Sequence, residues 1–196
     1  MWRWLWLVLA AVAFAGIAHP ALGQGQERPN IQEVLMAAAL TEADVPRGLV
    51  LNRERSGPRA GEQGGPSYTA SFMPDGTGDP SLVGVVNIVG QYPDAAAGMD
   101  ALTNRFRDAI GGSQTELPTP AVGEASRAFT LTSQVMGGAF TTSTTVVAVR
   151  RGDLVGGVAV AALGSTPQLD VALRLAESVD RRLAAALGPG PQRGGS

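Results

Sequence analysis

The stretch AFTTSTTVVAVRRGDLVGGVAVAAL, residues 139–163, decides the fold class because it predicts two strands joined by a tight turn. Its first part, residues 139–150, is rich in Thr and Val, and its second part, residues 154–163, is apolar; both compositions favour strands. Arg151 and Gly152 suit a hairpin turn, since glycine accepts the positive φ that such turns need. Two strands joined in this way run antiparallel, and we therefore expect an antiparallel sheet.

Outward from this hairpin, four further segments have the composition of strands. Residues 82–89 are apolar at nearly every position, as in a central strand covered on both faces or a strand with one thinly covered face. Residues 68–73 alternate in the manner of a half-buried strand. The other two strands are predicted at residues 49–55 and 126–133. A mobile loop and a connection are predicted from Gly, Pro and polar residues at 56–66 and 113–123.

Three amphipathic segments predict helices. A short first helix follows the cap residue Asn30, and a second, longer helix follows the cap residue Asp94. The last helix is predicted to begin with Thr166 as its cap and Pro167 at the first helical position. Helical spacing predicts the buried stripes of the second and last helices: Met99, Leu102, Phe106, Ala109 and Ile110, then Leu169, Ala172, Leu173, Ala176, Val179, Leu183 and Leu187.

The order helix, three strands, helix, three strands, helix places the chain in the α+β class. A helix with one apolar stripe needs a sheet face to cover. We therefore expect one α+β sandwich domain over residues 30–187, with a mainly antiparallel six-stranded sheet and amphipathic helices packed largely on one face. The two halves resemble each other in pattern but share no matching residues, so no sequence repeat is inferred.

The first residues have the order of an export signal. Arg3 precedes an apolar run over residues 5–17, and small residues at Ala21 and Gly23 follow a break in that run. We expect residues 1–23 to be a signal peptide cut near Gly23, which places the protein outside the cytoplasm; the alternative is a retained membrane anchor. Residues 24–29 are a polar lead-in and residues 188–196 a disordered tail.

The composition after this signal excludes several kinds of chemistry. The chain has no cysteine, its one histidine is His19, and all 15 basic residues are arginine. A chain cut after Gly23 therefore lacks the Cys, His and Lys side chains that commonly serve as nucleophile, base or zinc ligand. Its charge is −3, because the −2 of the whole chain includes Arg3. This balance, without a basic patch, argues against a nucleic-acid partner.

Two short motifs have both a functional and a structural interpretation. Asp75 and Asp79 lie four apart on a Gly-rich segment, a pattern that can hold calcium but that also suits a β-turn capped by its own Asp residues. The full ligand set of a calcium loop is missing. Arg151-Gly152-Asp153 spells a cell-adhesion tripeptide, yet it stands where the hairpin turn is needed. The turn interpretation is preferred for both motifs.

Other side chains are candidates by type alone. A pair of carboxylates could act in a glycosidase, although scattered surface acids fit the pattern as well; the candidates are Glu54, Glu62, Glu116 and Glu124. Tyr68 and Tyr92 could line a pocket or lie buried with one hydrogen bond each. The hydroxyl residues 141–145 have no His or Lys to activate them, and we interpret them as strand formers with an outward polar face.

Residues 40–48, LTEADVPRG, carry a family resemblance. They resemble the "L-T-x-x-D-L-P-x-G" start of small exported actinobacterial-type proteins, among them LpqN-like lipoproteins and the extracellular sensor domains of some bacterial Ser/Thr kinases. The resemblance implies a PsbP-like α/β sandwich over residues 30–187 and no catalytic residues. The chain departs from that group in having no lipobox cysteine, no disulfide pair and no attached kinase.

These observations favour a non-enzymatic exported domain, sensor-like or binding, for a ligand, a cell-envelope component or a partner protein. The alternatives are a carboxylate-only enzyme acting on glycans and a structural accessory subunit. No catalytic residue, metal ligand or cofactor is assigned, and no membrane span is expected after signal cleavage. An enzyme of this kind should show two facing carboxylates, one with a raised pKa, whereas a binding domain should show an apolar pocket or patch.

Overall fold

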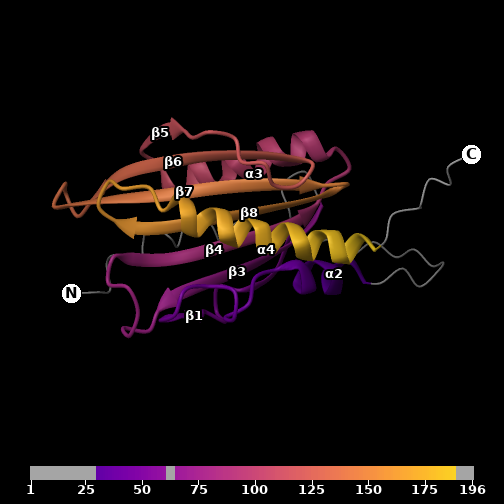
Figure 1. The fold of residues 1–196 in the computed structure, drawn as a ribbon, viewed down its shortest axis with the longest axis horizontal. Helices are drawn as coiled ribbons and strands as arrows, with labels where there is room; N and C mark the ends of the chain where they lie inside the picture. The colour runs from indigo at the N-terminus through magenta and orange to yellow at the C-terminus, as the bar shows by residue number, and fades with distance from the viewer. Residues whose placement is uncertain (1–29, 61–64, 189–196) are drawn as a thin grey trace, which may run out of the picture.

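An antiparallel sheet runs through the domain in the computed structural model, which describes residues 30–60 and 65–188 (Figure 1). The strand order is β1-β3-β4-β8-β7-β6-β5, and β2 pairs with β3 beside β1. The predicted α+β class and antiparallel sheet are confirmed. The predicted signal peptide, the lead-in and the tail from residue 189 lie outside the described residues. In chain order the elements are α2 (Ile31–Ala38), β1 (Leu49–Leu51), β2 (Gly57–Ala60), β3 (Pro66–Pro74), β4 (Leu82–Gln91), α3 (Ala95–Ile110), β5 (Ser113–Glu116), β6 (Ala125–Val135), β7 (Phe140–Arg151), β8 (Leu154–Leu163) and α4 (Leu169–Leu187).

The sheet has eight strands instead of the predicted six, because two short strands form within predicted loops. These are β2, with the sequence GPRA, and β5, with the sequence SQTE. Neither has apolar alternation, and each is a strand only because β3 or β6 offers a partner. The first predicted strand is also shorter than expected. It stops at Leu51 because the Asn52 side chain accepts hydrogen bonds from the backbone N–H groups of Glu54 and Arg55 and turns the chain.

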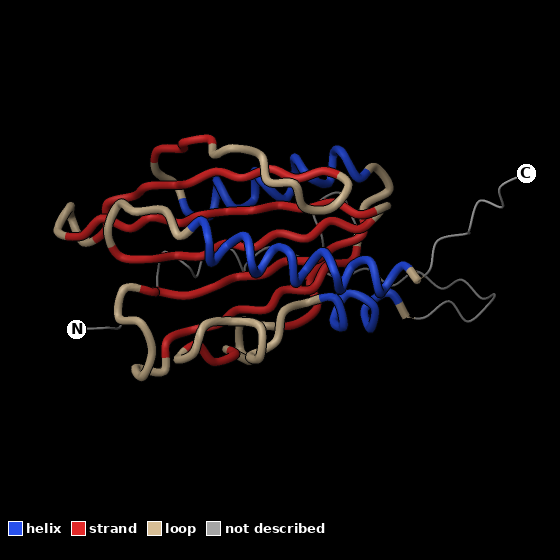
Figure 2. Tube along the Cα trace, in the orientation of Figure 1, coloured by secondary structure: helices blue, strands red, loops and turns tan. Residues whose placement is uncertain are grey.

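The described helices cover both faces of the sheet (Figures 1 and 2), so the prediction of helices largely on one face holds for α2 and α4 but is wrong for α3. Two neighbouring glycines of β8 show this directly. A Cβ on Gly156 would lie 2.5 Å from Val179 of α4, whereas a Cβ on Gly157 would lie 2.8 Å from Phe106 of α3. Successive residues of a strand point to opposite faces, so α3 and α4 sandwich the same strand. An apolar stripe predicts that a helix covers the sheet but not which face it covers.

Each face has its own apolar core. On the α4 face, α2 and α4 pack over residues such as Phe72, Val147 and Val158. On the α3 face, Phe106 and Leu102 pack over Phe129 and neighbouring residues. The predicted burial of Phe106 is confirmed, since none of its surface is exposed. The two cores together leave the central strands covered on both sides.

Four of the five hydroxyl residues at 141–145 are buried, which contradicts the expectation of an outward polar face. Thr142, Ser143, Thr144 and Thr145 are all less than a tenth exposed. One of them determines where the last helix begins. The hydroxyl oxygen of Thr145 accepts a hydrogen bond from the backbone N–H of Gln168 at 2.9 Å, and α4 starts at the next residue. The predicted start at Thr166 and Pro167 is therefore wrong.

The LTEADVPRG segment links α2 to the centre of the sheet. The buried Asn87 of β4 accepts a hydrogen bond from Leu40 N at 2.9 Å and donates one to Gly157 O at 3.0 Å. Asp44 accepts hydrogen bonds from Thr41 and is paired with Arg182 of α4 at 2.7 Å. Burial by itself raises the pKa of Asp44, but the hydrogen bonds from Thr41 and Arg182 outweigh it and hold that pKa below its usual value. The segment therefore has a structural role in this fold.

Candidate functional site

The two carboxylates of the β3–β4 turn cap their own backbone. Asp75 accepts hydrogen bonds from the N–H and the hydroxyl of Thr77, both at 2.7 Å. Asp79 accepts from the N–H and the hydroxyl of Ser81, both at 2.8 Å. These hydrogen bonds lower the pKa of both carboxyls. The part of the chain that the structure describes holds no group of three or more His, Cys, Asp or Glu residues arranged to bind a metal ion.

The Arg151-Gly152-Asp153 tripeptide forms the β7–β8 turn, and each of its residues is engaged within the domain. Arg151 makes two hydrogen bonds of 2.7 Å to Asp180 of α4, which raise the pKa of the guanidinium. The N–H of Gly152, at φ 58°, donates to Glu124 at 3.1 Å. Asp153 accepts a hydrogen bond from Gln91 at 2.5 Å. These contacts hold the turn against the rest of the fold.

The candidate glutamates are not brought together. Glu54 follows β1 at one edge of the sheet, whereas Glu116 is in β5 at the opposite edge. Glu116 pairs with Phe129 of β6, and Glu124 precedes that strand by one residue, so the backbones are roughly 17 Å apart along β6 at the usual strand rise. Retaining and inverting glycosidases need carboxylates within about 10 Å of each other. Glu62 lies outside the described residues.

The two tyrosines do not line a common pocket, because they lie on opposite faces of the sheet. Tyr92 is buried in the core beneath α3, where a Cβ on Gly98 would lie 2.4 Å from its ring. Tyr68 is partly buried and packs on the α4 face. Neither ring therefore marks a shared binding site.

Three exposed apolar side chains gather at the end of the sheet where β6 turns into β7. Met136 is 50% exposed, Phe140 47% and Leu163 38%. Phe140 is two residues before Thr142, which pairs with Leu163, so Phe140 and Leu163 lie on the same face. No charged residue stands between Arg127 and Arg150, nor between Asp153 and Asp170. We call Met136, Phe140 and Leu163, with the turn between β6 and β7, the uncharged end.

The hairpin at this end extends beyond its neighbours. On one side β5 pairs with β6 only as far as Thr132, and on the other side the pairing of β8 with β7 ends at Thr142. The tip is seen on the left of Figure 1. Met136 is at φ 55°, the left-handed region that few residues other than glycine adopt, and it stands directly before Gly137 and Gly138.

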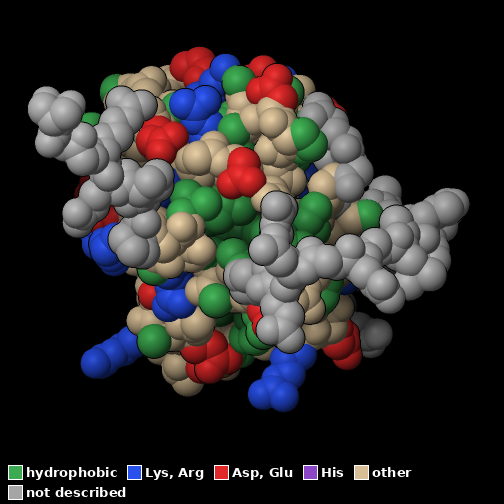
Figure 3. Space-filling view, turned by 90° about the vertical axis from the view of Figure 1, so that its right-hand side faces the viewer, with side chains coloured by type: hydrophobic (Ala, Val, Ile, Leu, Met, Phe, Trp, Pro, Cys, Tyr) green, Lys and Arg blue, Asp and Glu red, His purple; other side chains and the backbone are tan. Residues whose placement is uncertain are grey.

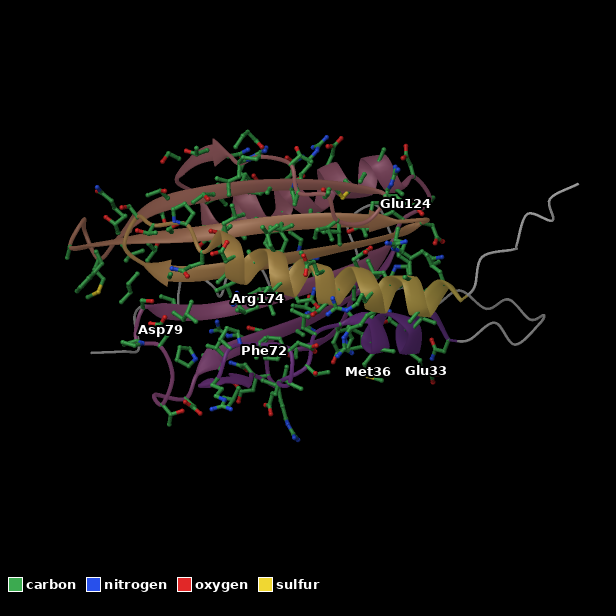
Figure 4. The ribbon with its side chains drawn as sticks, in the orientation of Figure 1. Glu33, Met36, Phe72, Asp79, Glu124 and Arg174 are labelled. Atoms are coloured by element: carbon green, nitrogen blue, oxygen red, sulfur yellow. The ribbon has the colours of Figure 1, made fainter. Side chains whose placement is uncertain are left out.

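The opposite end of the same strands carries charges of both signs. Figure 3 looks onto that end and shows arginine and acidic side chains spread over it. The ion pair of Arg151 with Asp180 lies there, together with Glu124, which Figure 4 places at the far end of the sheet from Asp79. Asp79 borders the uncharged end, because Ser81 O accepts a hydrogen bond from Leu163 N at 2.7 Å. The charged residues of the β6, β7 and β8 region, Arg127, Arg150, Arg151 and Asp153, therefore lie toward the end opposite the uncharged end.

Sequence reasoning missed this surface. Its signal was present as the long uncharged segment on either side of Met136, but that segment was interpreted only as strand and turn. Comparison of the chain with family models, curated proteins and solved structures gives no match. Of the described helices, none has the length and apolar character needed to cross a membrane.

Proposed function

We propose that this chain is a non-enzymatic exported domain that binds its target through the uncharged end. The observation that carries the proposal is the grouping of Met136, Phe140 and Leu163 at one end of the sheet, where the hairpin that carries Met136 and Phe140 projects. Exposed apolar side chains that occur singly are common on soluble proteins, whereas contiguous apolar patches are typical of interaction surfaces. The uncharged surroundings favour a target that is itself apolar or neutral.

The carboxylates support binding over catalysis. The described candidates lie at separate places, and the aspartates of the β3–β4 turn and of the segment before β1 are engaged in local hydrogen bonds. The pKa values of Asp44, Asp75 and Asp79 are lowered, which is opposite to what a general acid near neutral pH requires. A chain cut after Gly23 also has no His, Cys or Lys to serve as a base.

The place of action is part of the same proposal. The order of charged, apolar and small residues in 1–23 supports export, and the resemblance of LTEADVPRG to exported lipoproteins and sensor domains is consistent with it. In this proposal the protein works at or outside the cell envelope. N-terminal mass analysis of the protein recovered after export should show a start at or near Gln24.

The binding proposal is tested with two double variants of the full chain. The tip variant is Met136→Ser with Phe140→Ser. The control variant is Met36→Ser with Val50→Ser, which removes apolar side chains that are 54% and 41% exposed elsewhere. We expect a ligand found by thermal-shift screening of envelope lipids and neutral glycans to raise the melting temperature of the wild type and the control variant but not of the tip variant.

An activity screen on the same proteins tests the alternative, a carboxylate enzyme. Turnover of an ester, peptide, phosphate or glycan substrate that disappears when one Glu or Asp is changed to its amide would overturn the binding proposal in favour of a carboxylate enzyme. Equal thermal shifts in the wild type and in both variants would also overturn it, because the ligand would then bind elsewhere.

A further inference from the structure

The chemistry of the uncharged end identifies a class of target. We propose that the tip of the β6–β7 hairpin enters the interfacial layer of a neutral lipid bilayer, with Met136 and Phe140 inserted and Leu163 at the water boundary. This inference rests on the proposed function, since it names the target of the same surface.

The charge distribution favours a neutral bilayer. Moving a charged side chain into a bilayer is costly, and the ends of β6, β7 and β8 carry none. Acidic groups border this end on the β3–β4 turn, which Leu163 contacts through its hydrogen bond to Ser81. Asp75 and Asp79 on that turn would repel an anionic surface. The ends of β6, β7 and β8 themselves carry no cationic side chain that could attract acidic lipids.

Several backbone groups of the tip are already hydrogen-bonded within the hairpin, which suits an environment without water. Val135 pairs with Phe140 across the hairpin. The N–H groups of Gly138 and Ala139 donate to Val135 O and Met136 O within the turn, at 3.3 and 3.4 Å. Unsatisfied backbone donors are the main obstacle to placing an irregular segment in lipid. Shallow insertion of this turn leaves these two donors paired.

The shape of the tip favours a bilayer over a protein partner. A stable protein interface buries about 800 Å² on each side and involves 20 or more residues. The exposed apolar residues on the end of this narrow two-stranded ribbon are Met136 and Phe140, and Leu163 lies beside the ribbon at the end of β8. Such an end presents too little surface for a standard protein interface, but insertion into lipid needs only the apolar tip.

Single cysteines allow a direct test, because the chain has none of its own. A polarity-sensitive fluorophore is attached to the full chain at Met136→Cys or Phe140→Cys, and at Met36→Cys or Val50→Cys as controls. The proteins are mixed with phosphatidylcholine vesicles, with and without brominated acyl chains. We expect a blue shift and bromine quenching at 136 and 140 and neither at 36 and 50. Addition of phosphatidylglycerol should not strengthen the effect.

The comparison of positions separates tip insertion from attachment through the apolar residues 5–17. All labelled proteins share that segment, so it can bring them to vesicles but cannot make positions 136 and 140 differ from 36 and 50. In an unlabelled experiment, replacing Met136 and Phe140 by Ser should lower partitioning into phosphatidylcholine vesicles at least about ten-fold relative to the Met36 and Val50 control, which corresponds to about 1.4 kcal/mol.

Equal fluorescence responses at all four positions would overturn the inference. Suppose that a soluble ligand or a purified protein then raises the melting temperature of the wild type but not of the tip variant. In that case the proposed function stands and only its lipid target is wrong. If the tip variant loses nothing in either assay, both proposals fail.

Discussion

At one end of the β7–β8 pair, Arg151, Gly152 and Asp153 each bond to a side chain from another part of the fold. At the other end of the same strands, Phe140 and Leu163 are exposed, and Met136 extends from a hairpin that passes beyond both neighbouring strands. Both ends are turns of one antiparallel sheet and rest on the same two cores. They differ in that the three residues of the first turn bond to side chains elsewhere in the domain, whereas the apolar side chains of the second end remain exposed.

This difference separates structural motifs from a candidate contact surface. Two motifs have a functional interpretation in the sequence, the adhesion-like tripeptide and the paired aspartates. In the structure their hydrogen-bonding groups are engaged within the domain. The surface without internal partners is formed by residues that carry no recognised motif. We therefore base the proposed contact surface on exposed apolar area rather than on a sequence motif.

The largest effect should come from the core that carries both ends. Phe106 of α3 is fully buried against Gly157 of β8. Phe106→Ala should lower the free energy of unfolding by roughly 3–5 kcal/mol, because it leaves a cavity in a packed core. Asp108→Ala, on the exposed face of the same helix, should cost less than about 0.5 kcal/mol. Urea denaturation measures both, and similar losses would show that the helix faces are assigned wrongly.

We call the end with the β7–β8 turn and its charges of both signs the charged end. Substitutions there should have the next largest effect on stability. Asp180 is 14% exposed and makes both hydrogen bonds to Arg151. Asp180→Asn should destabilise the domain by about 1–2 kcal/mol, since it weakens two charge-assisted bonds that hold the β7–β8 turn. The exposed Glu177 of the same helix provides the control, and Glu177→Gln should stay within about 0.5 kcal/mol. Equal results would mean that the charged end is not held by this pair.

Acid should loosen the contact between α4 and the segment before β1. The pKa of Asp44 is lower in the folded state than the unfolded value of about 3.9, so its stabilising effect is present above that value and is lost as pH falls through the folded pKa. Asp44→Asn should therefore cost about 1 kcal/mol at pH 7, and the difference from wild type should shrink below about pH 4. Thermal unfolding of both proteins from pH 7 to pH 2.5 checks this. A constant difference over that range would contradict the assignment.

The smallest effect, and one of opposite sign, is expected at the uncharged end. Met136 occupies the left-handed region at φ 55°, which Asn tolerates better. Met136→Asn should stabilise the domain by about 0.5 kcal/mol while removing an exposed apolar side chain. The matched change Met36→Asn in α2 should destabilise slightly, because Asn is a poor helix former. A loss of stability from Met136→Asn would show that Met136 is retained for folding rather than for contact.

The sequence predicted the central part of this fold well. Residues 154–163 were predicted as the last strand and form β8 with those bounds, and the cap of α3 at Asp94 is also as predicted. These elements have strong local patterns, an apolar run and an amphipathic stripe bounded by turn residues. The short edge strands β2 and β5 were not predictable in this way, because only their pairing with a neighbour makes them strands.

Several of the other errors share one physical cause, which is that distant contacts outweighed local signals. Thr166 and Pro167 have the local pattern of a helix start, yet Thr145 from β7 bonds to Gln168 and α4 begins later. The hydroxyl residues 142–145 have the composition of an exposed face, yet helices on both faces bury them. The candidate site was missed for the same reason, since the exposure of Phe140 and Leu163 depends on where the neighbouring strands end.

The most direct test of the central claim is the chemical accessibility of the two surfaces in the cell envelope. Single cysteines replace Met136 or Phe140 at the uncharged end and Met36 or Val50 elsewhere. Their labelling rates with a water-soluble maleimide are compared between purified protein in buffer and envelope preparations from cells that produce the full chain. The proposal predicts strong protection at 136 and 140 in the envelope and unchanged rates at 36 and 50. Rates at 136 and 140 that are as fast in the envelope as in buffer would contradict it.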